Sequence, residues 1–372
     1  MDRRHFLLLS GGAAAALARP VSGSPSGAES TATLLPSPAG APPLAWKCYE
    51  TTIRVEVSKP AGLTRIWLPT PLTADTPYQR CMGNSWRADR GRTAQWIDPT
   101  YGAGVVWAQF PEGTPPVLEL TSRFATRDVA VDLAKPGVSV TENPSILAQY
   151  TAPTELLPTD GVVRATSEAI VKGATSDVER VRAIYEWVVE NSYRDPKTRG
   201  CGVGDVRFML ENKALGGKCA DLNALFVALC RSVGIPARDV YGVRVAPSAL
   251  GYRSLGKGGG VITTAQHCRA EFYLPSHGWV PADPADVRKV ILEEGGGKDP
   301  TDPMVLAARK RLFGAWEMNW LAYNSAHDLV LPGSSRGKVG FLMYPQAETA
   351  DGRVDCLDPD HFRYSITSRE IS

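Results

Sequence analysis

This sequence lacks several features that mark common classes of protein. Its 41 Lys and Arg nearly balance its 39 Asp and Glu, for a net charge of +2, so the charge does not favour a nucleic-acid partner or an anionic membrane surface. After the N-terminus, no run approaches the ~20 apolar residues that a membrane-spanning helix needs. The sequence has no Cys-x-x-Cys pair for a structural zinc, no Asp/Asn-rich calcium loop and no phosphate-loop motif. We therefore expect no transmembrane span, no metal and no cofactor.

The N-terminal segment has the pattern of an export signal. Arg3 and Arg4 precede an apolar run that ends at Ala16-Leu17-Ala18, a small-x-small cleavage pattern. This pattern resembles the twin-arginine motif, so residues 1–18 are predicted to be a signal peptide and the protein to be periplasmic or secreted. Residues 19–43 are rich in Ser, Pro, Gly and Ala and are predicted to be a flexible linker. The alternative is a cytoplasmic protein with an apolar N-terminus.

Residues 44–150 are predicted to form an N-terminal β-sandwich domain. Ile53, Val55 and Val57 alternate with polar residues, as in a strand with one buried face. Proline and glycine clusters separate further short segments of this kind, which is typical of a small sandwich; these segments are 66–68, 105–110, 118–124 and 129–133. The region also holds tryptophans that we expect to fill its core, the alternative being a sugar- or peptide-binding face: Trp46, Trp67, Trp86, Trp96 and Trp107.

The stretch after residue 215 carries the first chemical signal. A Gly216-Gly217-Lys218 turn, expected to leave room for a substrate, runs into apolar residues at helical spacing. A helix is therefore predicted to begin at or just after Cys219 and to end before Gly234. The unpaired N–H groups and the positive dipole end at a helix start favour an anion, and a thiol placed there ionises more easily. Cys219 is thus a candidate nucleophile, although a cysteine in this position is also typical of simple packing.

Two predicted strands downstream supply the partners that a thiol nucleophile needs. Residues 267–274 and 278–283 are rich in strand formers, and a Pro/Ser/Gly turn lies between them. If they form a hairpin, His267 and Asp283 lie at the same open end. In a Cys-His-Asp triad the imidazole takes the thiol proton, and the carboxylate orients the imidazole and stabilises its charged form. The register of the hairpin cannot be read from the sequence, and Asp286 is the alternative carboxylate.

These segments together resemble the motifs of a known family. Residues 217–238 are similar to the nucleophile helix of the transglutaminase-like superfamily, residues 267–273 to its histidine strand and residues 278–284 to its aspartate strand. The resemblance implies an α+β, papain-like catalytic domain, placed here at residues 151–372, with Cys219, His267 and Asp283 as catalytic residues. Arg269 departs from the family pattern, which often has an aromatic residue there, and is expected to make the pocket beside His267 more basic.

The predicted activity is that of a thiol hydrolase acting on peptide or other amide bonds. Cys219 would attack the carbonyl carbon to give a thioester, and His267 would then protonate the leaving amine. The backbone N–H of Cys219 is the expected oxyanion donor, with the side chain of Gln266 as a second candidate. Water is the expected acceptor, because Arg269 and two polar loops, residues 194–204 and 256–260, are predicted to surround the site. The second loop is expected to be a mobile lid.

Two alternative functions remain open at this point. A transglutaminase would use the same thioester but transfer the acyl group to an amine. A protein of another class would keep an idle triad and bind peptides or wall fragments in the periplasm. An amide-containing substrate is the partner that the sequence predicts, and nothing in it indicates an oligomeric state.

The cysteines and the C-terminal region complete the set of expectations. Seven cysteines in an exported protein fit one free thiol and at most three disulfides, with Cys48–Cys81 as a possible pair. Residues 302–323 are predicted to be helical. Strands are expected near 328–331, 340–344 and 362–366, where they would complete the sheet of the catalytic domain.

Overall fold

The structure is a computed structural model that describes residues 45–372 except 136 and 138. The predicted signal peptide and linker, residues 1–18 and 19–43, lie outside the described residues. The described residues belong to one compact unit, and the domain boundary between residues 150 and 151 stays a prediction. Among the helices that the structure describes, none has the length and apolar character needed to cross a membrane.

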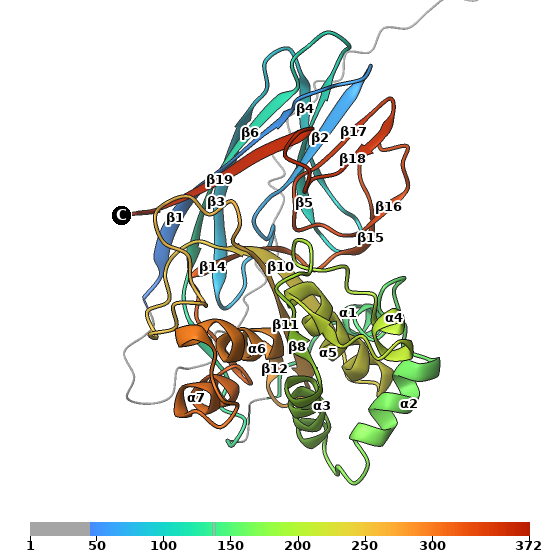
Figure 1. Cartoon of the computed structure of the whole chain (residues 1–372), viewed down its shortest axis with the longest axis vertical. Helices are drawn as coiled ribbons and strands as arrows, with labels where there is room; N and C mark the ends of the chain where they lie inside the picture. Colours follow the sequence, from blue (N-terminus) through green and yellow to red (C-terminus); the bar gives the residue numbers. More distant parts are fainter. Residues whose placement is uncertain (1–44, 136, 138) are drawn as a thin grey trace, which may run out of the picture. The chain divides into compact units, whose positions relative to one another are not determined.

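Two antiparallel sheets contain the strands of the first third of the chain (Figure 1). One has the order β19-β1-β6-β3, with bounds β1 Lys47–Val57, β3 Gln79–Arg87, β6 Val117–Thr126 and β19 Phe362–Ile371. The other has the order β18-β17-β2-β5-β4, with bounds β2 Thr64–Pro69, β4 Arg92–Ile97, β5 Gly104–Phe110, β17 Gln346–Thr349 and β18 Gly352–Val354. Side chains of both sheets, such as Val55 and Ile66, meet in one buried apolar cluster, as the sandwich prediction requires.

The end of the chain joins these two sheets instead of the catalytic sheet. β19 pairs with β1 from Cys48↔Ile371 to Val57↔Phe362, and β17 pairs with β2. The prediction that residues 362–366 complete the sheet of the catalytic domain is therefore wrong. It is also wrong for 328–331 and 340–344, because the strands there pair with each other in a separate two-stranded sheet. The alternation of apolar residues shows which face of a strand is buried, but it does not encode the strand with which it pairs.

A separate four-stranded antiparallel sheet carries the predicted histidine and aspartate strands. It has the order β12-β11-β10-β14, with bounds β10 Ala237–Arg244, β11 Gln266–Leu274, β12 Gly278–Ala282 and β14 Trp320–Asn324. The helix predicted for 302–323 ends early, because α7 spans only Pro303–Arg311. All residues of β14 are buried, and a short apolar run of this kind does not distinguish a strand from a helix.

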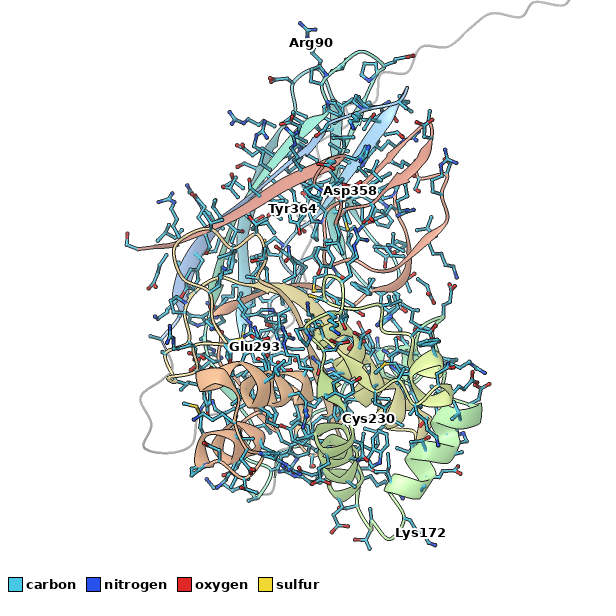
Figure 2. All side chains as sticks on the ribbon, in the orientation of Figure 1. Arg90, Lys172, Cys230, Glu293, Asp358 and Tyr364 are labelled. Carbon is cyan, nitrogen blue, oxygen red and sulfur yellow. The ribbon has the colours of Figure 1, made fainter. Side chains whose placement is uncertain are left out.

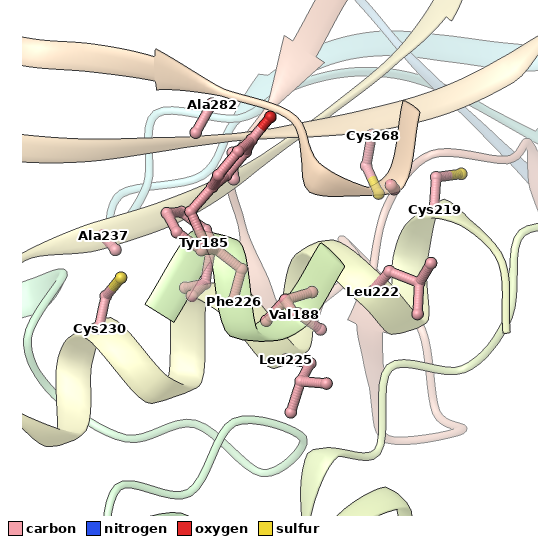
Figure 3. Packing of buried hydrophobic residues seen from close by; sticks show 14 of the residues in the cluster. Tyr185, Val188, Cys219, Leu222, Leu225, Phe226, Cys230, Ala237, Cys268 and Ala282 are labelled. Carbon is pink, nitrogen blue, oxygen red and sulfur yellow. The ribbon is translucent and has the colours of Figure 1, made fainter. Parts of the chain in front are cut away.

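The helices gather around α5, Cys219–Ser232, all of whose residues are buried. It packs on β10 and β11 and against α2, α3, α4 and α6. The helix is therefore buried on all sides, whereas apolar residues at helical spacing alone indicate one buried face. Leu222, Leu225 and Phe226 extend from it into the apolar core (Figure 3). The other helices are α1 Pro144–Gln149, α2 Gly161–Ile170, α3 Asp177–Asn191, α4 Val206–Glu211 and α6 Pro284–Glu293, with a short 3₁₀ turn at Glu294–Gly296.

Three short strand pairs complete the described secondary structure. They are β7 Val129–Ala130 with β13 Ala315–Trp316, β8 Tyr193–Arg194 with β9 Gly216–Gly217, and β15 His327–Val330 with β16 Lys338–Phe341. Within this framework Cys230 on α5 is fully buried, whereas Lys172, just beyond α2, is exposed at the periphery (Figure 2).

The tryptophans of the first sheets mainly fill apolar space. Trp67 has no exposed surface, Trp96 and Trp107 pack against its cluster, and Trp86 packs against the cluster between the sheets. For these residues core packing is confirmed. Trp46 differs, because it lies under two guanidinium groups, those of Arg80 and Arg127, at 4.5 and 4.7 Å from its ring centroid.

The suggested Cys48–Cys81 disulfide is wrong. Cys48 on β1 pairs with Ala125, and Cys81 on β3 pairs with Phe124, so β6 runs between the two cysteines. Two inter-strand spacings separate their Cα atoms by ~9–10 Å, more than the ~7 Å that a disulfide can bridge. All seven cysteines of the chain are free thiols in the structure.

Candidate functional site

Cys219 is the first residue of α5, as the sequence predicts. The helix start is fixed by two hydrogen bonds: Lys218 N–H donates to the Asp221 carboxylate at 2.9 Å, and Ala220 N–H donates to the Cys201 carbonyl at 2.9 Å. The N–H of Cys219 lies between these two donors and has no acceptor among the described residues. It is therefore available to a ligand at the positive end of the helix dipole.

The two glycines before Cys219 make room for protein atoms, not for a substrate. A Cβ on Gly216 would lie 2.3 Å from the ring of Tyr193. A Cβ on Gly217 would lie 2.5 Å from the Cβ of Asp221. The expectation that these glycines open a path for a substrate is therefore wrong, and their role is to let β9 pass close to β8 and α5.

A tight loop, residues 199–204, wraps around the start of α5. The Asp221 carboxylate accepts from the N–H groups of Val203 and Gly204, both at 2.9 Å. Gly202 has φ +96°, and a Cβ there would lie 1.8 Å from the same carboxylate, so only glycine fits. The loop also brings Cys201 to the helix start, with its thiol donating to the carbonyl of Gln266 at 3.3 Å.

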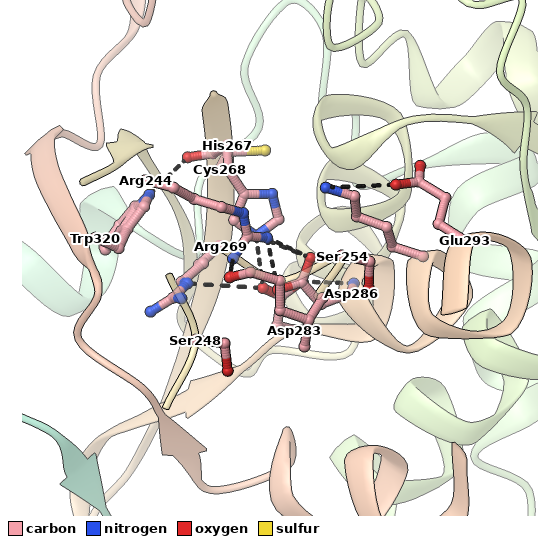
Figure 4. Close-up of polar contacts among 12 residues, drawn as sticks. Arg244, Ser248, Ser254, His267, Cys268, Arg269, Asp283, Asp286, Glu293 and Trp320 are labelled. Atoms are coloured by element: carbon pink, nitrogen blue, oxygen red, sulfur yellow. Dashed lines mark hydrogen bonds and ion pairs between the residues drawn. The ribbon is translucent and has the colours of Figure 1, made fainter. Parts of the chain in front are cut away.

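His267 and Asp283 meet at the open end of the β11–β12 hairpin, as predicted. The strands pair from Leu274↔Gly278 to Ala270↔Ala282, and Asp283 then caps α6 by accepting from the N–H of Asp286 at 3.0 Å. The Nε2 atom of His267 lies 2.8 Å from Oδ2 of Asp283 (Figure 4).

The backbone and the carboxylate of this pair are held by further buried groups. Trp320 Nε1–H donates to the carbonyl of His267 at 2.9 Å. Asn223, one turn after Cys219 on α5, donates to Oδ1 of Asp283 at 3.3 Å and to the carbonyl of Cys268 at 2.8 Å. The nucleophile helix and the hairpin are thereby tied to each other at the site.

Asp286 is a second carboxylate near the imidazole, but it is already paired. Its Oδ1 lies 3.4 Å from His267 Nε2. Arg244 Nη2, however, donates to both of its oxygens, at 2.6 and 2.8 Å (Figure 4). Burial opposes ionisation, but the charges of Arg244 and then His267 hold the pKa of Asp286 well below its usual range. Asp283, which has no such partner, has its pKa raised by burial and by the charge of Asp286.

The surroundings of His267 favour its charged form. Burial and the charge of Arg244 oppose protonation, but Asp286 and Asp283 outweigh them, and the pKa of His267 is raised above its ordinary value. Because Nε2 faces Asp283, the atom left for exchange with a thiol is Nδ1.

The surroundings of Cys219 favour its ionised, negatively charged form. The neighbouring thiols of Cys201 and then Cys268, with a further contribution from His267, hold the pKa of Cys219 well below that of an ordinary thiol despite burial. Burial and the same contact raise the pKa of Cys268, and the contact with Cys219 followed by burial raises that of Cys201. Figure 3 shows Cys268 beside the start of α5, with Cys219 at its first turn. The ionised sulfur is therefore the one at the helix start.

Arg269 lines only a hollow of about 10 Å³, together with Asp286 and Glu317, so the basic substrate pocket expected beside His267 is not supported. Only 2% of Arg269 is exposed; its Nη1 donates to the carbonyl of Glu317 at 2.8 Å, and its guanidinium lies 4.7 Å from the ring centroid of Trp320. Burial lowers the pKa of Arg269 to about 10. Its Nε lies 3.8 Å from Asp283, so it acts on the site from behind the carboxylate.

The 256–260 segment is not a free lid. Lys257 N–H donates to the carbonyl of Ala246, and Ser368 N–H of β19 donates to the carbonyl of Gly260. A Cβ on Gly256 would lie 2.3 Å from the backbone of Ser248, so this glycine serves close packing. The predicted gating role is therefore not supported by the contacts of this segment.

Gln266 has a partner of its own. Its Nε2 donates to the hydroxyl of Tyr364 at 3.2 Å, which leaves one amide hydrogen for another acceptor. Its role as a second oxyanion donor stays a prediction.

Among the described residues, His267, Asp283 and Asp286 form a group that could hold a metal ion. Ligand atoms of His267, Asp283 and Asp286 lie within 4.8 Å of one another. Arg244 already occupies both oxygens of Asp286, and a guanidinium in that place repels a cation. The arrangement fits proton transfer between Cys219 and His267 better than metal binding.

Several groups at this site were not predicted from the sequence. Arg244 interrupts an apolar strand between Val243 and Val245, and Asn223 interrupts an apolar helix. A lone polar residue in a buried element is a usable signal, because such a residue needs a partner. Cys201 gave no comparable signal, since a cysteine in a glycine-containing loop has no sequence context that places it near Cys219.

Comparisons with known proteins agree with the motif pattern. The family model of the transglutaminase-like superfamily matches residues 164–284. An uncharacterized protein of Haemophilus influenzae is 32% identical over 342 residues, which cover 87% of this chain and 91% of that protein. Among solved structures, a candidate cysteine protease from Cytophaga hutchinsonii has a TM-score of 0.49 at 17% identity, covering 88% of this chain and 99% of its own.

A second solved structure, the periplasmic domain of TgpA from Pseudomonas aeruginosa, has a TM-score of 0.36 at 15% identity and covers 66% of this chain and 91% of its own. The family match covers the helix with Cys219 and the hairpin with His267 and Asp283, the segments on which the predicted resemblance depends. The chain, a mixed α+β protein, belongs to the transglutaminase-like superfamily.

Proposed function

We propose that this protein is a thiol hydrolase that cleaves peptide or other amide bonds through Cys219, His267 and Asp283. The observation that carries the proposal is the 2.8 Å contact between His267 and Asp283 next to a thiol of lowered pKa at a helix start. Burying three ionisable groups together costs free energy. A protein that only binds peptides has no physical need for that arrangement, which argues against an idle site.

The chemistry follows from the atoms that remain free. The Cys219 thiolate attacks the carbonyl carbon of the amide, and the resulting oxyanion accepts from the backbone N–H of Cys219. His267, protonated and held by Asp283 at Nε2, gives the proton at Nδ1 to the leaving amine. The thioester at Cys219 then reacts with water that His267 deprotonates, which releases the acid and restores the thiolate.

Transfer of the acyl group to an amine is the second candidate, and a specific observation favours it. Only 3% of Cys219 and 4% of His267 are exposed, and an amine transferase must keep water from the thioester. Hydrolysis remains the first candidate, because water is small enough to reach such a site without rearrangement. Because Arg269 is buried, its charge does not favour water over an amine, or an amine over water, as the acceptor.

Partitioning of the thioester decides between the two reactions. An amide substrate that acylates Cys219 would be offered a primary amine at rising concentration, and acid and amide products would be quantified by mass spectrometry. We expect acid to dominate at millimolar amine. Dominant amide product would replace the hydrolase with a transglutaminase, and no product from the wild type together with unchanged peptide binding by the Cys219→Ala variant would indicate a binding protein.

We further propose that residues 1–18 direct export and that the chain acts in the periplasm or outside the cell. The support is the Arg3-Arg4 pair with its apolar run and the Ala16-Leu17-Ala18 pattern. We also propose a division into a β-sandwich at 44–150 and a catalytic domain at 151–372. The C-terminal strands β17 to β19 would belong to the first part, because they lie in its two sheets.

A further inference from the structure

A cleft lies on the face of the central sheet that is turned away from α5. On β10, Ala237 and Tyr241 pack in the same apolar cluster as the helix, whereas Arg238 and Val240 line the cleft. Because successive side chains of a strand point to opposite faces, the sheet itself separates the cleft from Cys219. His267 pairs with Gly242 and therefore points to the same face as the cleft, but none of Cys219, His267 and Asp283 is among the residues that line it.

The cleft has the size of a small-molecule site. Its volume is about 340 Å³, within the range of ligand pockets in proteins. Its walls are the β2–β3 loop at 72–78, the β4–β5 loop at 100–102, helix α1 and the end of β14. Together with Arg238 and Val240 of β10, five separate segments thus converge on one hollow.

Among the described residues that line the cleft, no side chain carries an unpaired charge. Arg238 is the one charged side chain among them, and its Nε and Nη2 atoms both contact Glu271 at 2.7 Å. A guanidinium paired in this way has little charge left for an anionic ligand. The ligand that suits the cleft is therefore neutral.

Hydroxyl groups are the commonest polar side-chain groups among the residues that line the cleft. The hydroxyls of Tyr150 and Ser325 lie 2.7 Å apart, and one donates to the other. This contact uses one of their two hydrogens, so the second is left to donate to a ligand. Tyr101, Thr100 and Gln149 add further groups that both donate and accept. A ligand whose own groups both donate and accept, such as a sugar hydroxyl, matches this surface.

The cleft also has aromatic faces held in place. The rings of Tyr101 and Tyr150 lie 6.2 Å apart with 52° between their planes. Tyr150 packs edge-on against Trp279 at 5.4 Å, and the Arg238 guanidinium lies 5.2 Å from its centroid. Because Arg231 also lies over the Tyr150 ring at 5.9 Å and Tyr150 is 5% exposed, the partly exposed Tyr101 is the ring that can meet the C–H face of a pyranose. Its fixed position lowers the entropy cost of binding.

The geometry points to a saccharide-binding site in this cleft, whose ligand is a neutral sugar or a short neutral glycan. The site goes beyond the proposed function, because it depends on neither the thiol nor the imidazole. It would let the protein hold a glycan on one face of the sheet while α5 presents Cys219 on the other.

Calorimetric titration of the full chain with chitotriose, cellotriose and maltotriose tests this inference. We expect at least one of them to bind with a millimolar or tighter Kd. Tyr101→Ala should weaken binding about tenfold, the effect of losing one aromatic contact. Tyr150→Phe, which keeps the ring, should weaken it several-fold. Tyr193→Ala, a tyrosine on β8 outside the cleft, is the matched control and should change nothing.

The outcomes separate this site from the catalytic proposal. Cys219→Ala should bind the same sugar with unchanged affinity, whether or not the protein is a hydrolase. The inference is overturned if none of the three sugars binds, if binding ignores both cleft variants, or if only a peptide binds in the cleft. Circular dichroism of each variant shows that a lost signal reflects the site and not unfolding.

Discussion

His267 lies 2.8 Å from Asp283 and 3.4 Å from Asp286 through the same Nε2 atom, so the imidazole faces two carboxylates at once. Arg244 distinguishes them, because it donates to both oxygens of Asp286 and to neither oxygen of Asp283. Asp283 is thereby left as the carboxylate that orients the imidazole.

The thiol cluster at the start of α5 gives the first prediction. Because the pKa of Cys219 is lowered, its thiolate should persist as the pH falls below the ~8.5 of an ordinary thiol, and iodoacetamide labelling should be lost only as the pH falls through the lowered value. Cys201→Ala removes the neighbouring thiol that contributes most to the lowered pKa of Cys219, so the pH midpoint of labelling should rise. Cys81→Ala on β3 is the control and should leave it unchanged. A wild-type midpoint near that of free cysteine would contradict the assignment.

The second prediction concerns the carboxylate that orients His267. Asp283→Asn should lower kcat by about 10⁴-fold, because the imidazole loses its charged partner. The fold should persist, since an Asn side chain can also cap α6. Asp239→Asn, another fully buried acid of the same sheet, is the control and should keep its kcat per folded molecule. If Asp283→Asn turns over normally, Asp286 is the orienting group.

Arg244 gives a third prediction that joins stability and titration. Arg244→Met leaves Asp286 buried and unpaired, which should lower the free energy of unfolding by about 3–5 kcal/mol. The pKa of His267 should rise further, since the charge of Arg244 opposes its protonation; the imidazole would then stay charged to higher pH. NMR titration of His267 measures this change.

A matched control separates the two effects of Arg244. Arg238→Met breaks another buried ion pair, with Glu271 at 2.7 Å, and should destabilise the protein comparably. It should leave the pKa of His267 unchanged. Equal His267 titration in both variants would mean that Arg244 has a purely structural role.

Export gives a fourth prediction. Replacing Arg3 and Arg4 by Lys should hold the precursor in the cytoplasm, because the twin-arginine route reads that pair. Cell fractionation with a periplasmic marker measures the result. Unchanged accumulation outside the cytoplasm would indicate the general secretion route, and an uncleaved wild-type chain in the cytoplasm would mean no export.

The catalytic motifs were predictable because each combines a local pattern with a residue type that chemistry demands. The start of α5 at Cys219 follows from the turn and the apolar spacing, and the position of His267 and Asp283 at one end follows from the hairpin. Their contact distance did not follow, because register depends on pairing across the turn. The involvement of Arg244 and Cys201 depends on tertiary packing, which brings β10 and a distant loop to the same place.

The C-terminal strands show the same limit in the fold. The alternation in β19 correctly predicts a strand with one buried face, but its partner β1 lies more than 300 residues earlier in the chain. Arg269 is the reverse case. Its position two residues after His267 puts it on the same face of β11, but there it is buried against Trp320, and its charge acts on Asp283.

The most direct test of the account is to trap the thioester. The protein would be mixed with short peptide amides and activated peptide esters, quenched in acid within seconds, and examined by intact-mass and peptide-mapping mass spectrometry. We predict an acyl adduct on Cys219 that decays in wild type and is absent from Cys219→Ala, while Cys230→Ala, which changes a buried thiol on the same helix, retains it. Turnover that persists in Cys219→Ala, or an adduct that maps to another residue, would contradict the account.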